Sequence, residues 1–112
     1  MLKSVLIANR GEIAVRIARA CTDLGIRSTT VFAEDDVTSK HSSYGDVAIP
    51  LRGVGPDAYL DMEQIIAAAK RADCDAIHPG YGFLSESDVF ARKCASSNLI
   101  FIGPPPEALA LF

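Results

Sequence analysis

The segment HPGYGFLSE at residues 78–86 holds the densest group of side chains that could contact a ligand. Tyr81 and Phe83 offer flat aromatic surfaces, and the tyrosine adds a hydroxyl group. Gly80 and Gly82 permit backbone conformations and close approaches that a Cβ atom would forbid. The segment therefore predicts a surface that meets a planar or bicyclic ligand, although a rigid turn with aromatic packing explains the same residues equally well.

The second half of this segment has the pattern of a helix start. Ser85 is the predicted N-cap, and Asp88 three residues later is an imperfect capping-box partner. Glu86 would then take the first helical position, where its carboxylate either complements the helix dipole or projects into a cleft. His78 precedes Pro79 as a lone histidine, with no cluster of His, Cys or acidic residues to complete a metal site.

A second group of functional candidates is charged. Glu12, Arg16, Arg19 and Asp23 recur at steps of four, three and four, which places them on one face of a predicted helix. Such a ridge is either a solvated face, in which each pair contributes about 0.2–0.5 kcal/mol, or a protein interface. Arginine suits the second use because its guanidinium pairs with carboxylates through two hydrogen bonds.

The turn Asn9-Arg10-Gly11-Glu12 joins a predicted strand to a predicted helix, as a dinucleotide-binding turn does. That fingerprint needs three glycines where this turn has Gly11 alone, and Glu12 puts a negative charge where phosphates would lie. A Walker A motif is missing from the sequence as well. With no nucleophile beside a base, we assign no catalytic residue and no metal ligand in this chain.

The elements that must position these residues alternate along the sequence. Short apolar runs predict strands at residues 4–8, 28–32, 47–49, 76–78 and 100–102, and helical periodicity predicts helices at residues 11–24, 61–72 and 85–97. This alternation predicts an α/β fold: a Rossmann-like parallel sheet with helices on both faces. Ligands bind at the carboxyl edge of such a sheet, where the segment 78–86 begins.

Finer features complete this prediction. The first helix should bury one apolar stripe and end at Gly25 as a left-handed C-cap. The stripe consists of Ile13, Ile17, Ala20, Cys21 and Leu24. Residues 34–45 and 52–57 are predicted loops, the first with at most one helical turn. Residues 107–112 begin an apolar helical pattern that stops at the last residue, so we expect the native protein to continue.

Composition restricts the class of protein. The 112 residues, of which 49% are hydrophobic, suit one domain, and the net charge of -3 offers no basic surface to nucleic acid. The apolar runs are far shorter than the roughly 18 residues that cross a bilayer, so we expect no membrane partner. Cys21, Cys74 and Cys94 are too widely spaced for a metal motif, which favours reduced packing residues and a cytoplasmic location.

Four motifs taken together resemble the N-terminal domain of biotin carboxylases. They are IANRGEIAVRIARAC at 7–21, LGI at 24–26, AIHPGYGFLSE at 76–86 and FIGP at 101–104. The resemblance covers nearly the whole chain in the right order and spacing. It implies that residues 1–112 form a Rossmann-like domain truncated before an ATP-grasp domain. The whole unit in this family uses ATP, magnesium and bicarbonate to carboxylate biotin on a carrier domain.

The resemblance also implies roles for single residues. Tyr81 and Gly82 match the loop beside the biotin ureido ring, and Glu86 matches a carboxylate at the wall of that site. The charged ridge matches a helix that forms a dimer contact in bacterial members, through Arg16, Arg19 and Asp23. Aspartate at the last of these positions is shorter than the glutamate usual in the family, which could weaken a pair across the interface.

The implied partners are the ATP-grasp part of the same enzyme, a biotin carrier domain and a second copy in a homodimer. Biotin on its carrier, ATP and magnesium are the expected cofactors of the full enzyme, and none is expected to bind this chain tightly. Two alternatives stay open at this point. One is an ATP-grasp ligase like the large chain of carbamoyl-phosphate synthetase, and the other is a stand-alone, non-catalytic binding module. The final carboxyl acceptor, such as an acyl-CoA, pyruvate or urea, is also open.

Overall fold

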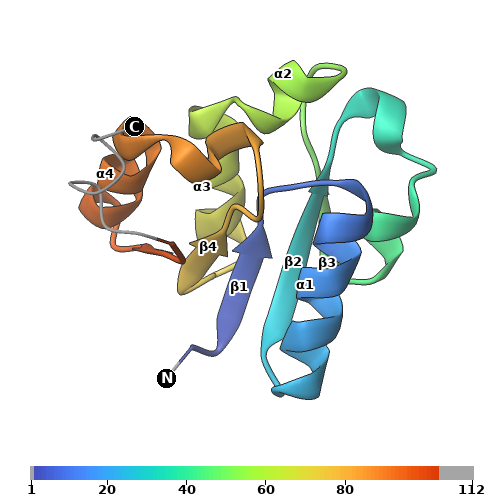
Figure 1. Ribbon diagram of the computed structural model, residues 1–112, viewed down its shortest axis with the longest axis horizontal. Helices are drawn as coiled ribbons and strands as arrows, with labels where there is room; N and C mark the ends of the chain where they lie inside the picture. The colour runs from blue at the N-terminus through green and yellow to red at the C-terminus, as the bar shows by residue number, and fades with distance from the viewer. Residues whose placement is uncertain (1, 104–112) are drawn as a thin grey trace.

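A computed structural model describes residues 2–103, which form alternating strands and helices (Figure 1). The strands are β1 (Ser4–Ile7), β2 (Arg27–Phe32), β3 (Val47–Pro50), β4 (Ala76–His78) and β5 (Ile100–Phe101). The helices are α1 (Gly11–Asp23), α2 (Pro56–Tyr59), α3 (Met62–Arg71) and α4 (Asp88–Ser96). The strands and the three longer helices fall where the sequence predicts them, and the predicted helical pattern at 107–112 lies outside the described residues.

The sheet is parallel throughout, with strand order β3-β2-β1-β4-β5. The chain therefore runs outward from β1 to β3 in one direction and then crosses to β4 and β5 in the other. This reversal creates a topological switch point between the carboxyl ends of β1 and β4, which is where open parallel sheets bind ligands. The fold class predicted from the sequence is confirmed.

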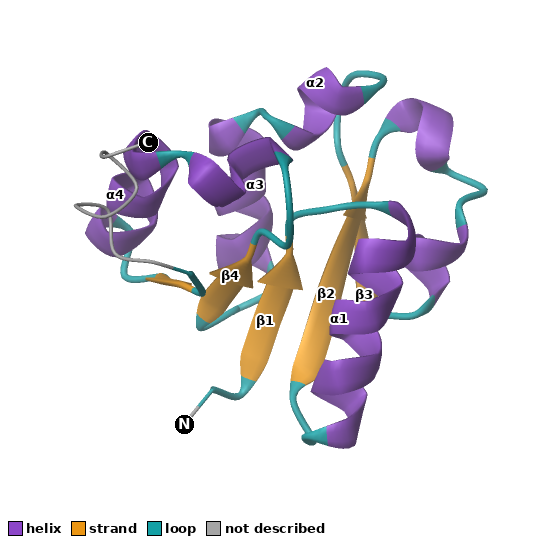
Figure 2. Ribbon diagram, viewed as in Figure 1, coloured by secondary structure: helices purple, strands orange, loops and turns teal. Residues whose placement is uncertain are grey.

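Helices cover the sheet from both sides, with α1 in front of the strands and α3 behind them in Figure 2. Alternate side chains of the central strand serve the two sides, as the pleat of a strand requires. Leu6 joins the larger core beneath α3 and α4, which includes Ile65, Ile77 and Phe90. Val5 packs against Cys21 on the α1 side.

Helix α1 does not bury the predicted stripe. Of its five residues only Cys21 is buried, while Ala14 and Ala18 provide the rest of the buried surface. Leu24 is 74% exposed. The prediction was wrong because the small residues Ala14 and Ala18 face the sheet, while the larger Ile13 and Ile17 are only partly buried at the flank of the helix. Most of the apolar stripe predicted from the sequence is therefore partly or fully exposed in residues 2–103.

The end of α1 follows the sequence prediction. Gly25 has a φ of +71°, the left-handed conformation expected of a C-cap glycine. Its amide donates to the Thr22 carbonyl, and the Ile26 amide donates to the Cys21 carbonyl at 2.8 Å. These two bonds form a Schellman motif, which satisfies carbonyl groups that the helix end would otherwise leave free.

The start of α4 differs from the prediction. Phe83–Glu86 form a 3₁₀ turn, so Glu86 ends this turn and does not open the helix, and Ser85 is not the N-cap. Ser87 caps α4 instead, since its hydroxyl accepts a hydrogen bond from the Phe90 amide at 3.1 Å. The predicted loops also contain more structure than expected: 3₁₀ turns at Glu34–Asp36 and Lys40–Ser43, and the helix α2.

Candidate functional site

The loops that follow β1 and β4 meet at the switch point of the sheet. The Ala8 amide donates to the His78 carbonyl at 2.9 Å, which extends the β1–β4 pairing to the end of both strands. Residues 79–82, which we call the switch loop, then turn away from β4. Residues 9 and 10 leave β1 beside this loop and lead into α1. Segments about seventy residues apart in the sequence therefore form one surface.

Backbone conformation shapes the switch loop. Gly80 and Gly82 have φ values of +66° and +68°, in the left-handed region that favours glycine. A Cβ on Gly80 would come within 2.8 Å of Asn9 Nδ2, whereas a Cβ on Gly82 would meet no atom of residues 2–103 within 4 Å. Gly80 is thus needed for packing, and Gly82 presents open backbone. Tyr81 between them is 78% exposed.

The side chain of Asn9 holds the switch loop through hydrogen bonds to its backbone. Its side chain is 1% exposed, and its Nδ2 donates to the carbonyls of Pro79 and Tyr81, both at 2.7 Å. Its Oδ1 accepts from the Arg10 amide at 2.8 Å. The side-chain amide therefore uses both of its N–H groups on the loop.

His78 holds the loop from the strand side. Its Nδ1 accepts a hydrogen bond from the Gly80 amide at 3.1 Å, which leaves the proton of the neutral ring on Nε2. Burial lowers the pKa of His78 below its ordinary value of 6.5, because the charged imidazolium would lose hydration. The ring is thus neutral at pH 7 and can keep accepting from Gly80.

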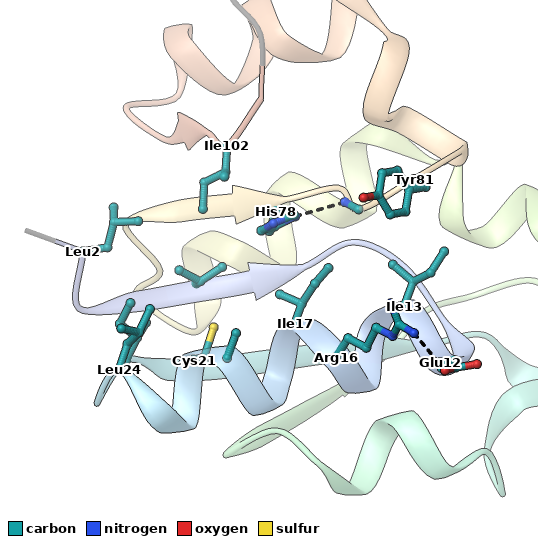
Figure 3. Close-up of a pocket in the computed structure, with 14 residues that line it drawn as sticks. Leu2, Glu12, Ile13, Arg16, Ile17, Cys21, Leu24, His78, Tyr81 and Ile102 are labelled. Carbon is teal, nitrogen blue, oxygen red and sulfur yellow. Dashed lines mark hydrogen bonds and ion pairs between the residues drawn. The ribbon is translucent and has the colours of Figure 1, made fainter.

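An apolar groove of about 720 Å³ runs from the switch loop along the flank of α1 (Figure 3). Ile13, Ile17 and Leu24 line it from the helix, and Ile102 faces them from the end of β5. Tyr81 and Arg16 stand at the end near the switch loop. The residues of the apolar stripe predicted on α1 therefore line this groove.

The structure separates the three predicted biotin-site residues. Tyr81 lines the groove and Gly82 lies next to it with open backbone. Glu86 is exposed at the end of the 3₁₀ turn and does not line the groove. Within residues 2–103, Tyr81 and Gly82 are thus adjacent at the groove, and Glu86 lies four residues further along, at the end of the 3₁₀ turn.

The predicted interface residues are all exposed on α1, and two of them have contacts within the chain. Arg16 pairs with Glu12 at 3.5 Å across one helical turn at the rim of the groove (Figure 3). The Arg19 guanidinium instead lies over the Tyr44 ring, 5.2 Å from its centroid, which is a cation–π geometry. Asp23 is exposed near the end of the helix.

The comparisons with known proteins now assign a family. The family model described as "Biotin carboxylase, N-terminal domain" matches residues 1–109. The chain belongs to this family. The resemblance read from the four motifs is thereby confirmed, and the alternative of a carbamoyl-phosphate synthetase-like ligase is not supported.

Curated relatives and solved structures agree with this biotin carboxylase assignment. The chain is 54% identical to pyruvate carboxylase of Bacillus subtilis and 51% identical to biotin carboxylase of Halalkalibacterium halodurans, over 99% and 97% of its length. Those alignments span 10% and 24% of the relatives. The solved biotin carboxylase domain of a single-chain bacterial carboxylase superposes with a TM-score of 0.95 and 50% identity, over 98% of this chain and 26% of that one. The chain thus corresponds to a small part of each relative.

An ionic cluster that joins the half-exposed Arg10 to the buried Asp36 and Tyr59 was not predicted from the sequence. Asp36 accepts two hydrogen bonds from the Arg10 guanidinium, both at 2.7 Å, and one from the Tyr59 hydroxyl. The hydrogen bonds from Arg10 hold the pKa of Asp36 well below its ordinary range, and burial raises the pKa of Tyr59. The cluster anchors the turn that carries Asn9. No local pattern predicts it, because Arg10 and Tyr59 lie 26 and 23 residues from Asp36 in the sequence.

The remaining expectations concern metals, thiols and membranes. No group of three His, Cys, Asp or Glu side chains within the described residues could hold a metal ion. All three cysteines are buried free thiols, and burial raises the pKa of Cys94 to about 11. No helix within residues 2–103 has the length and apolar character to cross a membrane.

Proposed function

We propose that this chain is the N-terminal part of an enzyme that carboxylates biotin with ATP and bicarbonate, and that the switch loop forms one wall of the biotin site. The observation that carries this proposal is a glycine-flanked, exposed Tyr81 held at the switch point of a biotin carboxylase N-terminal domain. Ligands of open parallel sheets bind at this position.

The residues present fit the chemistry of biotin. Its ureido ring is planar and polar and is fused to an apolar ring, so it needs a flat contact and an unobstructed backbone. The Tyr81 ring supplies the first, and Gly82, with nothing within 4 Å of its Cβ position, supplies the second. Both act by orienting the ring, which is how an enzyme converts binding into reactive geometry. We assign Glu86 to the outer edge of the same site.

The residues present do not fit ATP or magnesium. The turn into α1 has Gly11 alone in place of a phosphate-binding glycine motif, with Glu12 after it. No carboxylate cluster within the described residues could coordinate magnesium. We therefore assign both to the ATP-grasp part of the enzyme and derive no step through them. The isolated chain should carry no turnover of its own.

The exposed charges of α1 support a second element of the proposal, a contact between two copies of the complete enzyme. Arg16, Arg19 and Asp23 are all exposed on this helix, so a second copy could contact them. The biotin carrier domain would approach the switch loop. We place the enzyme in the cytoplasm, where its three buried thiols stay reduced. The final carboxyl acceptor is not assigned.

ADP release by the complete enzyme that carries this chain tests the proposed function. We expect release that requires bicarbonate and rises with the concentration of free biotin. The isolated 112-residue chain, purified in the same way, is the control and should release none above background. ADP release indifferent to biotin in the complete enzyme would refute the proposal, and turnover by the isolated chain would refute the assignment of catalysis to the rest of the enzyme.

A further inference from the structure

The side chain of Asn9 occupies an unusual place for a polar group. It is 1% exposed and lies where the carboxyl end of β1 meets the switch loop. All three of its observed hydrogen bonds are to backbone atoms, and two of these belong to the loop. A buried amide is costly unless its hydrogen bonds are made, so this arrangement commits the backbone to one geometry.

The orientation of the Asn9 amide is fixed by its own neighbours. Its Oδ1 accepts from the Arg10 amide. A flipped side chain would place the Asn9 NH₂ group against the Arg10 N–H and the Asn9 oxygen against the carbonyl oxygens of Pro79 and Tyr81. Arg10 is itself held by its paired bonds to Asp36. The turn that carries Asn9 is therefore anchored independently of the switch loop.

The loop rests directly on this amide. A Cβ on Gly80 would come within 2.8 Å of Asn9 Nδ2, so the glycine leaves no gap between the two. The carbonyls of Pro79 and Tyr81, which flank Gly80, point back to the same nitrogen at 2.7 Å. Asn9 thereby fixes the position and orientation of the backbone that carries the Tyr81 ring.

We propose that Asn9 is a positioning residue for biotin: its side-chain amide holds the switch loop so that Tyr81 and Gly82 present a preorganised wall to the ureido ring. This inference rests on the proposed function, because it takes the loop as the biotin wall. Asn9 would act through the loop and would not contact biotin itself. Losing it should therefore affect biotin use while leaving ATP use unchanged.

The test compares two side-chain amides that each bind backbone atoms of a loop. Asn9→Ala and Asn9→Asp remove the donors to the switch loop, the second by placing a carboxylate oxygen against two carbonyls. Gln64→Ala and Gln64→Glu are the matched controls. Gln64 bonds the backbone of Arg52 in both directions, at 2.7 and 2.8 Å, away from the switch loop. The alanine variant of Asn9 keeps the test usable if the buried charge of N9D prevents folding.

Two measurements on the complete enzyme read out the effect. In N9A the KM for free biotin should rise about tenfold, the cost of one or two buried hydrogen bonds, while the KM for ATP stays within about twofold of the parent. Hydrogen–deuterium exchange of the Gly80 amide, which donates to His78 Nδ1 within the switch loop, should become about tenfold faster. Neither change should appear in Q64A or Q64E.

Exchange and kinetics together separate the possible failures. A folded N9A whose loop exchanges as slowly as the parent overturns the positioning role. Faster exchange with an unchanged KM for biotin also overturns it, since the loop would then move without consequence for the ligand. If the parent shows no response to biotin, the proposed function has failed, and exchange alone decides whether Asn9 fixes the loop.

Discussion

The two faces of the sheet in this chain are built differently. Beneath α3 and α4, large side chains such as Ile65 and Phe90 are fully buried in one continuous core. On the other face, α1 meets the sheet through Ala14 and Ala18, and its isoleucines line an open groove. Within residues 2–103, one face is a closed core and the other carries an apolar groove beside the switch loop. An apolar stripe in a sequence therefore does not by itself show which side of a helix faces the core.

The same truncation on the two faces should give the largest difference. Ile65→Ala removes a fully buried side chain and should lower the free energy of unfolding by about 2–5 kcal/mol. Ile17→Ala removes a partly exposed side chain from the groove wall and should cost about 1 kcal/mol or less. Urea denaturation of the 112-residue chain measures both. Equal losses would contradict the division between a stabilising face and an open face.

Two glycine substitutions sharpen the comparison at the switch loop. Gly80→Ala combines a positive φ with contacts of 2.8 Å to Asn9 and Ile13, so it should cost about 2–4 kcal/mol. Gly25→Ala has the same kind of φ and open space around its Cβ, and should cost about 1 kcal/mol. Thermal unfolding compares them. A G80A variant no less stable than G25A would show that the loop does not rest tightly on Asn9.

The ionic cluster behind the switch point makes a prediction about pH. Because the folded state lowers the pKa of Asp36, its contribution is complete above the ordinary value of about 3.8 and is lost as pH falls through and below it. Asp36→Asn should cost about 2 kcal/mol at pH 7 and much less at pH 2–3. Chemical denaturation across this range measures the difference. A penalty that does not change with pH would mean that the Asp36 charge contributes nothing.

The smallest effect on stability should come from the outer surface of α1. Arg19→Glu removes an exposed cation–π contact and should change the free energy of unfolding by about 0.5 kcal/mol or less. In the complete enzyme it should weaken self-association, because an unpaired charge at an interface is costly. Sedimentation velocity at low concentration measures this. Lys70→Glu, on the exposed side of α3, is the control. If the R19E dimer is as stable as the parent dimer, the charged residues of α1 form a solvated face and not an interface.

Sequence patterns predicted the fold well because strand and helix periodicities are local. The parallel sheet, the three longer helices and the C-cap at Gly25 all follow from them. The buried side of α1 was mispredicted, since periodicity identifies an apolar stripe but not which residues are small enough to let the helix approach the sheet. The start of α4 was mispredicted because Phe83–Glu86 form a 3₁₀ turn and Ser87, in an extended conformation, caps the helix, whereas Ser85 two residues earlier is an equally good cap by residue type.

The candidate site was only partly predictable for a different reason. Tyr81 and Gly82 were found through their own motif, and the structure brings them to the switch point as expected. Asn9 was assigned to a tight turn, and nothing in its neighbourhood pointed to residues 79–81. Its contacts, like those between Arg10 and Asp36, join distant parts of the chain. Only the topology of the sheet brings them together.

The most direct test of the central claim is the biotin dependence of the complete enzyme with Gly82→Ala. A Cβ at Gly82 would meet no atom of the described residues within 4 Å. Apart from backbone strain, we therefore expect this substitution to act on a ligand that approaches the loop. Gly25→Ala matches the strain at the other end of α1, away from the switch loop. We predict that G82A raises the KM for biotin or slows carboxylation at least tenfold with ATP affinity unchanged, while G25A does neither. A folded G82A that carboxylates biotin as efficiently as the parent would contradict the assignment of the switch loop to the biotin site.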